Sequence, residues 1–167
     1  MKNAVISIVL LMAFLSGCDR FDTVIGLNEN IHHDDFNYRV TAVEKRKSIV
    51  ADSVHMIAVG TFYIVTFEVE NDAMRVGHKW DNQIAYVISD KGIKYENNVA
   101  AQQLLNIKEP FEWHSAYNTG HGSSERTRLV FDIQGNPSEL YLKVHGETLM
   151  GDVFNLNRFK RIKIKLL

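Results

Sequence analysis

The feature that most constrains this chain is an alternation of apolar and polar residues with a period of two. It occurs in segments 36–42, 63–69, 129–133, 140–144 and 162–166. Successive side chains of a β-strand point to opposite faces of the sheet, so this period is typical of half-buried strands. With the short apolar run 84–88 and the strand expected at 93–95, the chain has about seven predicted strands and almost no helical periodicity. The pattern therefore predicts an all-β fold, an antiparallel β-sandwich over residues 36–167.

Three segments add detail to this prediction. Phe62 and Ile64 make the second face of segment 61–70 apolar as well, which predicts a central strand. The sequence Ser-Asp-Lys-Gly at 89–92 predicts the turn of a hairpin, because glycine adopts positive φ without strain. Residues 99–105 favour a short helix inside a long connection, 97–124, and residues 46–60 are interpreted as a second loop.

Length, charge and cysteine content exclude several classes of protein. The chain has 167 residues, enough for one ordinary domain. Its net charge of −1 argues against a general nucleic-acid binder, which carries a basic excess. The single cysteine excludes a disulfide framework and a zinc site built from cysteines.

The N-terminus is typical of a secreted protein. Lys2 precedes an uncharged apolar run of twelve residues, from Ala4 to Leu15. A membrane-spanning helix needs about 20 residues, so the run is too short to cross a bilayer. It fits the apolar core of a secretory signal, with small residues at the cleavage point.

The four residues Leu15-Ser16-Gly17-Cys18 that end this run resemble the lipobox of bacterial lipoproteins. The resemblance implies that residues 1–17 are a signal peptide and that Cys18 carries a thioether-linked diacylglycerol. Two or three acyl chains hold a protein firmly on a bilayer, here on the extracytoplasmic face. In an enteric-type Gram-negative host, Asp19 implies retention in the inner membrane; the alternative is an ordinary polar residue.

The stretch that follows, 18–35, is predicted to be the lipidated cysteine and a flexible tether. Polar residues dominate it and leave few side chains to pack. Fully extended, a tether of about 17 residues reaches at most some 55–60 Å, so the domain would not need to touch the bilayer.

Segments 63–71, 88–95, 128–133 and 139–144 resemble, in order and spacing, the bacterial family called domain of unknown function 4352. They correspond to a long central strand ending in Asn71, a hairpin, and the two strands that follow. The resemblance covers about two-thirds of the chain and implies an immunoglobulin-like sandwich, often on a lipoprotein. The run Gly-His-Gly-Ser-Ser at 120–124 departs from the turn usual there. The family supplies no established active site.

Three groups of side chains are candidates for binding. Aromatic and histidine residues on the 97–124 loop can line a ligand pocket or an interface, or can close one end of the sandwich: Trp113, His114, Tyr117 and His121. His32-His33-Asp34-Asp35 carries metal-competent side chains, but neighbours in an extended chain point in opposite directions. Basic residues of the last strand could meet anionic lipid or simply guard a sheet edge: Arg158, Lys160, Arg161, Lys163 and Lys165.

These observations favour a non-enzymatic, membrane-anchored lipoprotein that serves as a protein-interaction or accessory module of the cell envelope. Sequence motifs of serine hydrolases, P-loop nucleotide-binding proteins and zinc proteases are missing from the chain. We expect no cofactor, no metal and no nucleic-acid partner. The expected partners are the bilayer, through Cys18, and an extracytoplasmic protein. The alternative is a small-ligand or metal-binding lipoprotein that uses the 97–124 loop.

Overall fold

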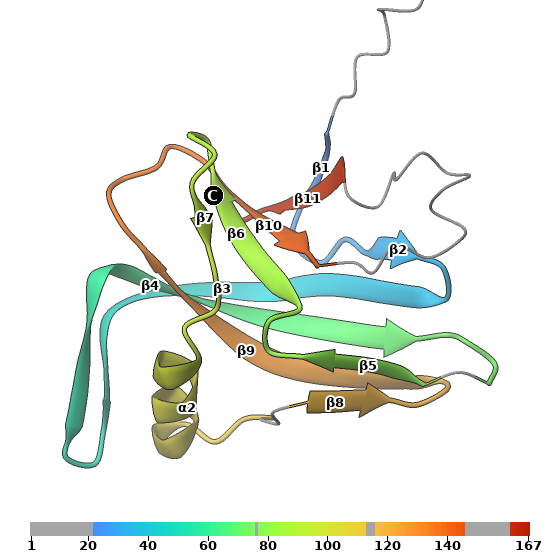
Figure 1. Ribbon diagram of the computed structural model, residues 1–167, viewed down its shortest axis with the longest axis horizontal. Helices are drawn as coiled ribbons and strands as arrows, with labels where there is room; N and C mark the ends of the chain where they lie inside the picture. Colours follow the sequence, from blue (N-terminus) through green and yellow to red (C-terminus); the bar gives the residue numbers. More distant parts are fainter. Residues whose placement is uncertain (1–21, 76, 113–115, 146–160) are drawn as a thin grey trace, which may run out of the picture.

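The computed structural model describes residues 22–75, 77–112, 116–145 and 161–167 (Figure 1). Cys18, Asp19 and the predicted signal peptide lie outside these residues. The elements in chain order are β1 (Thr23–Ile25), β2 (Ile31–His33), β3 (Phe36–Ala51), β4 (Val54–Asn71), β5 (His78–Asp81), β6 (Ala85–Ser89), β7 (Lys94–Tyr95), α2 (Val99–Lys108), β8 (Ala116–Thr119), β9 (Ser123–Ile133), β10 (Leu140–Val144) and β11 (Ile162–Lys165). Within the described part of the chain, no helix has the length and apolar character needed to span a membrane.

The strands form two main sheets and a separate pair. A five-stranded sheet has the order β1-β11-β10-β6-β7, a four-stranded sheet the order β2-β3-β4-β9, and β5 pairs with β8. This confirms the predicted all-β sandwich. The described residues contain eleven strands rather than about seven, because several strands are only two to four residues long. The pairing of β1 with β11 is parallel, an exception to the predicted antiparallel arrangement that the other described strand pairs follow.

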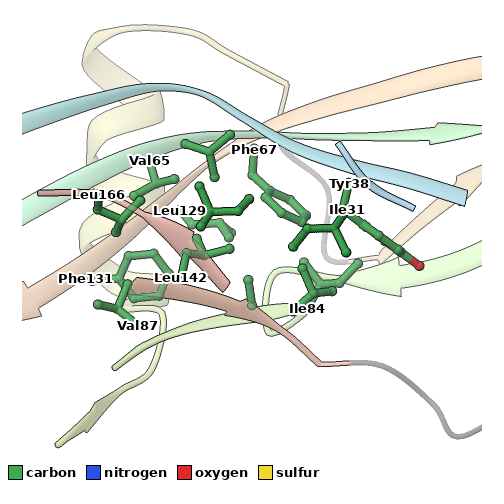
Figure 2. Packing of buried hydrophobic residues seen from close by; sticks show 14 of the residues in the cluster. Ile31, Tyr38, Val65, Phe67, Ile84, Val87, Leu129, Phe131, Leu142 and Leu166 are labelled. Atoms are coloured by element: carbon green, nitrogen blue, oxygen red, sulfur yellow. The ribbon is translucent and has the colours of Figure 1, made fainter. Parts of the chain in front are cut away.

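The main core lies between the two large sheets. Tyr63, Val65 and Phe67 of β4 alternate inward and join residues from β9, β10 and β6 in one cluster. Figure 2 shows Phe67, Leu129, Phe131 and Leu142 packed together in this cluster. Strand β4 runs between β3 and β9, which confirms its prediction as a central strand.

A second cluster covers the back of the four-stranded sheet. Phe62, Ile64 and Val130 point away from the main core and pack against buried residues of α2, among them Leu105. Figure 1 shows α2 lying beside the end of this sheet. The predicted helix at 99–105 is confirmed and extends to Lys108. Its N-terminus is capped by Asn98, whose Oδ1 accepts a hydrogen bond from the amide of Ala101 at 3.0 Å.

The described part of the predicted tether belongs to the fold, so that prediction is wrong for residues 22–35. Strand β1 pairs with β11, and β2 pairs with β3. Ile31 is 1% exposed and His33 is 7% exposed, while His32 between them faces solvent. A strand of three residues is too short to display a period, and polar neighbours conceal it. Residues 18–21 lie outside the described residues.

The predicted loop at 46–60 is also wrong, because these residues continue β3 and β4 as a long hairpin. The hairpin turns at Asp52, whose φ of 51° is the left-handed conformation that Asp tolerates better than most residues. We call residues 48–59 the hairpin arm. Figure 1 shows the arm bending away from the sheet and running beside α2.

Candidate interaction surface

The hairpin arm has one covered face and one exposed face. Ile49 and Met56 are register partners, and both belong to the cluster against α2. The neighbouring pair Val50 and His55 lies on the opposite face, because successive residues of a strand alternate. Several large aliphatic side chains of the arm are open to solvent: Val50 at 40%, Val54 at 52%, Ile57 at 68% and Val59 at 81%.

The arm also has free strand edges among the described residues. Strand β9 pairs with β4 only from Thr61 onward, and β2 pairs with β3 only as far as Tyr38. The carboxylate of Asp132 accepts hydrogen bonds from the amides of Val59 and Gly60, at 2.8 and 2.9 Å. This leaves the β4 edge open over residues 54–58, which contain no Asp, Glu, Lys or Arg. Exposed edges are usually guarded by charge or by proline, so this edge is suited to receiving another strand.

A charged cluster holds the C-terminal end of α2 against the sheet. The Glu109 carboxylate accepts two hydrogen bonds from Arg46, at 2.7 and 3.0 Å, and one from Arg128, at 3.2 Å. The hydrogen bonds from Arg46 are the largest of the effects that lower the pKa of Glu109 below its usual value. The Arg128 guanidinium also lies 4.8 Å from the centre of the Phe111 ring. The cluster therefore ties the base of the arm, at Arg46, to the end of α2.

A buried polar network fixes the other side of α2. Gln102 is 0% exposed and accepts a hydrogen bond from Asn97 Nδ2 at 2.7 Å. Its own Nε2 donates to Asn82 Oδ1 at 3.0 Å and to Thr127 Oγ1 at 3.2 Å. Asn97 in turn accepts from the amide of Val130 on β9 at 2.8 Å. Because these groups are out of contact with water, their hydrogen bonds specify one position for the helix.

The structure does not gather the predicted loop residues into one site that can be described. Trp113 and His114 lie outside the described residues. Tyr117 lies in β8, in register with Trp80. His121 lies in the turn after β8, where its Nδ1 hydrogen-bonds to the carbonyl of Ala73. This turn lies at the opposite end of the four-stranded sheet from the arm (Figure 1).

The other two candidate groups are also partly described. His32 bonds Asn37 Oδ1 through Nδ1 at 2.9 Å, while His33 points inward. Among the residues that the structure describes, no three His, Cys, Asp or Glu side chains group closely enough to hold a metal ion. Of the basic end segment, Lys163 and Lys165 lie in β11, and Arg161 directly precedes it. Arg158 and Lys160 lie outside the described residues.

Sequence reasoning missed the hairpin arm. A signal was present, because Asp52-Ser53 is a turn dipeptide between two runs rich in Ile, Val and Ala. Apolar residues on both faces concealed the period, since α2 covers one face and the other is exposed.

No protein-family model and no curated protein matches this chain. Solved structures share its fold. The YjhA protein of Bacillus subtilis has a TM-score of 0.57 and 11% identity, covering 85% of this chain and 98% of that protein. The secreted protein MPT63 of Mycobacterium tuberculosis has a TM-score of 0.56 and 12% identity, with coverage of 88% and 99%. An uncharacterised β-sandwich protein of Clostridium difficile has a TM-score of 0.52 and 11% identity, with coverage of 89% and 97%. At these identities the likeness shows the β-sandwich fold alone.

Proposed function

We propose that this chain is an extracytoplasmic, lipid-anchored and non-enzymatic interaction module of the cell envelope. Cys18 carries the anchor, and the hairpin arm binds an extended strand of a protein partner. In an enteric-type Gram-negative host, Asp19 keeps the protein in the inner membrane, facing the periplasm. The resemblance to the lipobox supports the anchor, and the resemblance to domain of unknown function 4352 supports a lipoprotein built on a sandwich.

The chemistry of the anchor joins the Cys18 thiol to a diacylglyceryl group from a phospholipid and then consumes one water molecule to cleave the chain. The sulfur forms a bond to the terminal glycerol carbon of the diacylglyceryl group. The bond from that carbon to the phosphate oxygen breaks, the headgroup phosphate leaves with the electron pair, and the thiol gives up its proton. Hydrolysis of the Gly17–Cys18 peptide bond then frees the signal peptide. All described residues follow Cys18, so cleavage there removes none of them.

The observation that carries the binding role is the unguarded hairpin arm. Val59 and Ile57 are the most exposed aliphatic residues of the arm, at 81% and 68%. The backbone of residues 54–58, which include Ile57, offers hydrogen-bond donors and acceptors to an incoming strand. In strand addition, backbone hydrogen bonds supply affinity, and alternate side chains supply specificity. The expected partner is therefore a protein segment that is extended and aliphatic.

Mass spectrometry of the protein from native membranes tests the anchor. We expect a chain that begins at Cys18 and carries acyl groups, and we expect a Cys18→Ser variant to keep its signal peptide and incorporate no labelled fatty acid. Labelled fatty acid on the Cys18→Ser chain would contradict the anchor.

Photo-crosslinking from position 57 in native membranes tests the arm. With a photo-crosslinking residue at position 57 and the rest of the arm unaltered, we expect one protein to be crosslinked. The same crosslink should disappear when Val59→Glu is added. Ile93→Glu is the matched control, because Ile93 is also an exposed aliphatic residue, at 50%, but lies outside the arm. A Trp113→Ala, Tyr117→Ala variant tests the alternative surface. Capture that survives Val59→Glu and fails in the loop variant would move the binding role to the 97–124 loop.

A further inference from the structure

The outer side of the five-stranded sheet is rich in lysine and tyrosine. Leu140, Leu142 and Val144 of β10 face the core, so the residues between them face outward. The same alternation on β11, β6 and β7 completes a surface that we call the basic face: Tyr86, Ile88, Lys94, Tyr141, Lys143, Lys163 and Lys165. Register joins these residues across strands, with Tyr141 opposite both Lys165 and Ile88.

The lysines of the basic face lie over its tyrosines. The Lys163 ammonium is 4.1 Å from the centre of the Tyr141 ring, and the Lys94 ammonium is 4.2 Å from the centre of the Tyr86 ring. This arrangement places cationic groups above aromatic rings, the combination found where proteins meet the headgroup layer of a bilayer.

Carboxylates surround the basic face, but they leave it with a positive balance. Lys163 pairs with Asp22 at 3.3 Å, Lys165 with Glu139 at 3.4 Å, and Lys94 with Glu96 at 2.5 Å. The side chains of these three carboxylates are 40–49% exposed. Exposed ion pairs are weak, so their lysines can also attract another anion. Lys143 adds a fourth cation against these three carboxylates. The charge of Asp90, which acts on Glu139 and Tyr141, is offset by its neighbour Lys91.

The position of β1 places the basic face within reach of the anchor. Thr23, the first residue of β1, is only five positions after Cys18, with four residues between them. Five residues span at most about 17 Å, in contrast to the 55–60 Å expected for a long tether. Strand β1 forms the edge of the five-stranded sheet beside β11, and Val24 is the register partner of Lys163. Val24 is 47% exposed. The hairpin arm and α2 lie on the other side of the molecule from β1 (Figure 1).

We propose that the basic face docks on the anionic phospholipid headgroups of the membrane that holds the Cys18 anchor. This inference rests on the proposed anchor and adds an orientation to it: the outer side of the five-stranded sheet faces the bilayer, and the arm points away. Each lysine brought to an anionic surface strengthens binding by about fivefold. The lipid on Cys18 attaches the protein to the membrane, and the basic face determines which side of the domain contacts the headgroups.

A fluorescent probe on a single new cysteine tests this orientation in the lipidated protein. Acylation occupies the Cys18 sulfur, so Val24→Cys or Ile57→Cys supplies the only free thiol for a bimane label. Both positions are exposed aliphatic residues of a strand. Each protein is reconstituted in phosphatidylcholine vesicles with or without 30% phosphatidylglycerol, with spin-labelled lipid as the quencher. With phosphatidylglycerol present, we expect quenching at position 24 and little at position 57.

Neutralising lysines tests whether charge causes the docking. Lys143→Gln with Lys165→Gln removes two cations of the basic face. We expect the ratio of docked to undocked protein to fall about 25-fold, the product of two fivefold effects. Lys79→Gln with Lys108→Gln is the control, because both lysines are exposed and lie outside this sheet. The control should match the unaltered protein.

The possible failures can be told apart by the intact mass of the same samples. An acylated protein whose position 24 probe stays unquenched in anionic vesicles refutes the docking and leaves the anchor standing. Equal quenching at positions 24 and 57, or equal effects of the two lysine pairs, also refutes it. A chain without acyl groups refutes the anchor, and the docking with it.

Discussion

Replacing Gln102 with methionine should lower the free energy of unfolding by much more than a substitution on the surface does. Methionine has a similar length and no hydrogen-bonding amide, so the change removes the bonds to Asn97, Asn82 and Thr127. Asn82 Oδ1 keeps a second donor, Thr127 Oγ1, at 3.3 Å. Asn97 Nδ2 loses its acceptor at Gln102, and Asn97 is only 6% exposed.

The expected size follows from these losses. A buried donor without an acceptor costs about 1–3 kcal/mol, and each hydrogen bond contributes about 1 kcal/mol net. The apolar gain from burying methionine offsets part of this. We therefore expect the free energy of unfolding to fall by about 2–4 kcal/mol, which lowers Tm by about 5–15 °C for a chain of this length.

Urea unfolding followed by tryptophan fluorescence measures this difference. The matched control is Gln103→Met, because Gln103 is the next residue of the same helix and faces solvent. The control should lie within about 0.5 kcal/mol of the unaltered protein. If both variants unfold at the same urea concentration, the buried network contributes nothing, and the argument for it is wrong.

Two further predictions concern the charged cluster and the bend of the arm. Arg46 lowers the pKa of the Glu109 carboxyl in the folded protein. The ionised carboxylate therefore stabilises the fold above the pKa that Glu109 has in the unfolded chain, and this stabilisation is lost as pH falls through the folded pKa. Glu109→Gln should therefore lower Tm at pH 7 and converge with the unaltered protein in acid; a constant difference across pH would contradict this. In Gly60→Ala, the new methyl would lie 1.9 Å from the Ile133 carbonyl oxygen, so we expect a loss of more than about 2 kcal/mol in chemical unfolding. Gly92→Ala, with open space but φ of +76°, should lose only about 1 kcal/mol, and an equal loss would contradict the steric argument.

Long strands with one consistent period could be predicted from the sequence. Tyr63, Val65 and Phe67 form one apolar face of β4, and Phe62 and Ile64 make the opposite face apolar as well. A strand with two apolar faces is expected in the centre of a sheet. The helix at 99–105 could be predicted because its residues favour helix, whereas its continuation to Lys108 was not predicted.

Short strands could not be predicted, because their stability comes from partners distant in sequence. Thr23–Ile25 depends on β11, about 140 residues later, and no local pattern reveals that pairing. Ile31 looks like an isolated apolar residue until the sheet places it in the main core. The candidate site was missed for a related reason. The arm carries apolar residues on both faces, so its sequence shows neither the period of two of a half-buried strand nor the period of a helix.

The position of the arm's exposed face depends on buried residues that a binding partner cannot contact. An isolated two-stranded hairpin is marginally stable in water, and β9 supports β4 only from Thr61 onward. The arm is therefore held chiefly by α2, and α2 is held in place by the buried network around Gln102. It follows that Gln102→Met should weaken crosslinking from Ile57 although Gln102 is 0% exposed, whereas Gln103→Met should not. Undiminished crosslinking in a Gln102→Met protein that is measurably destabilised would show that the arm keeps its shape without the helix.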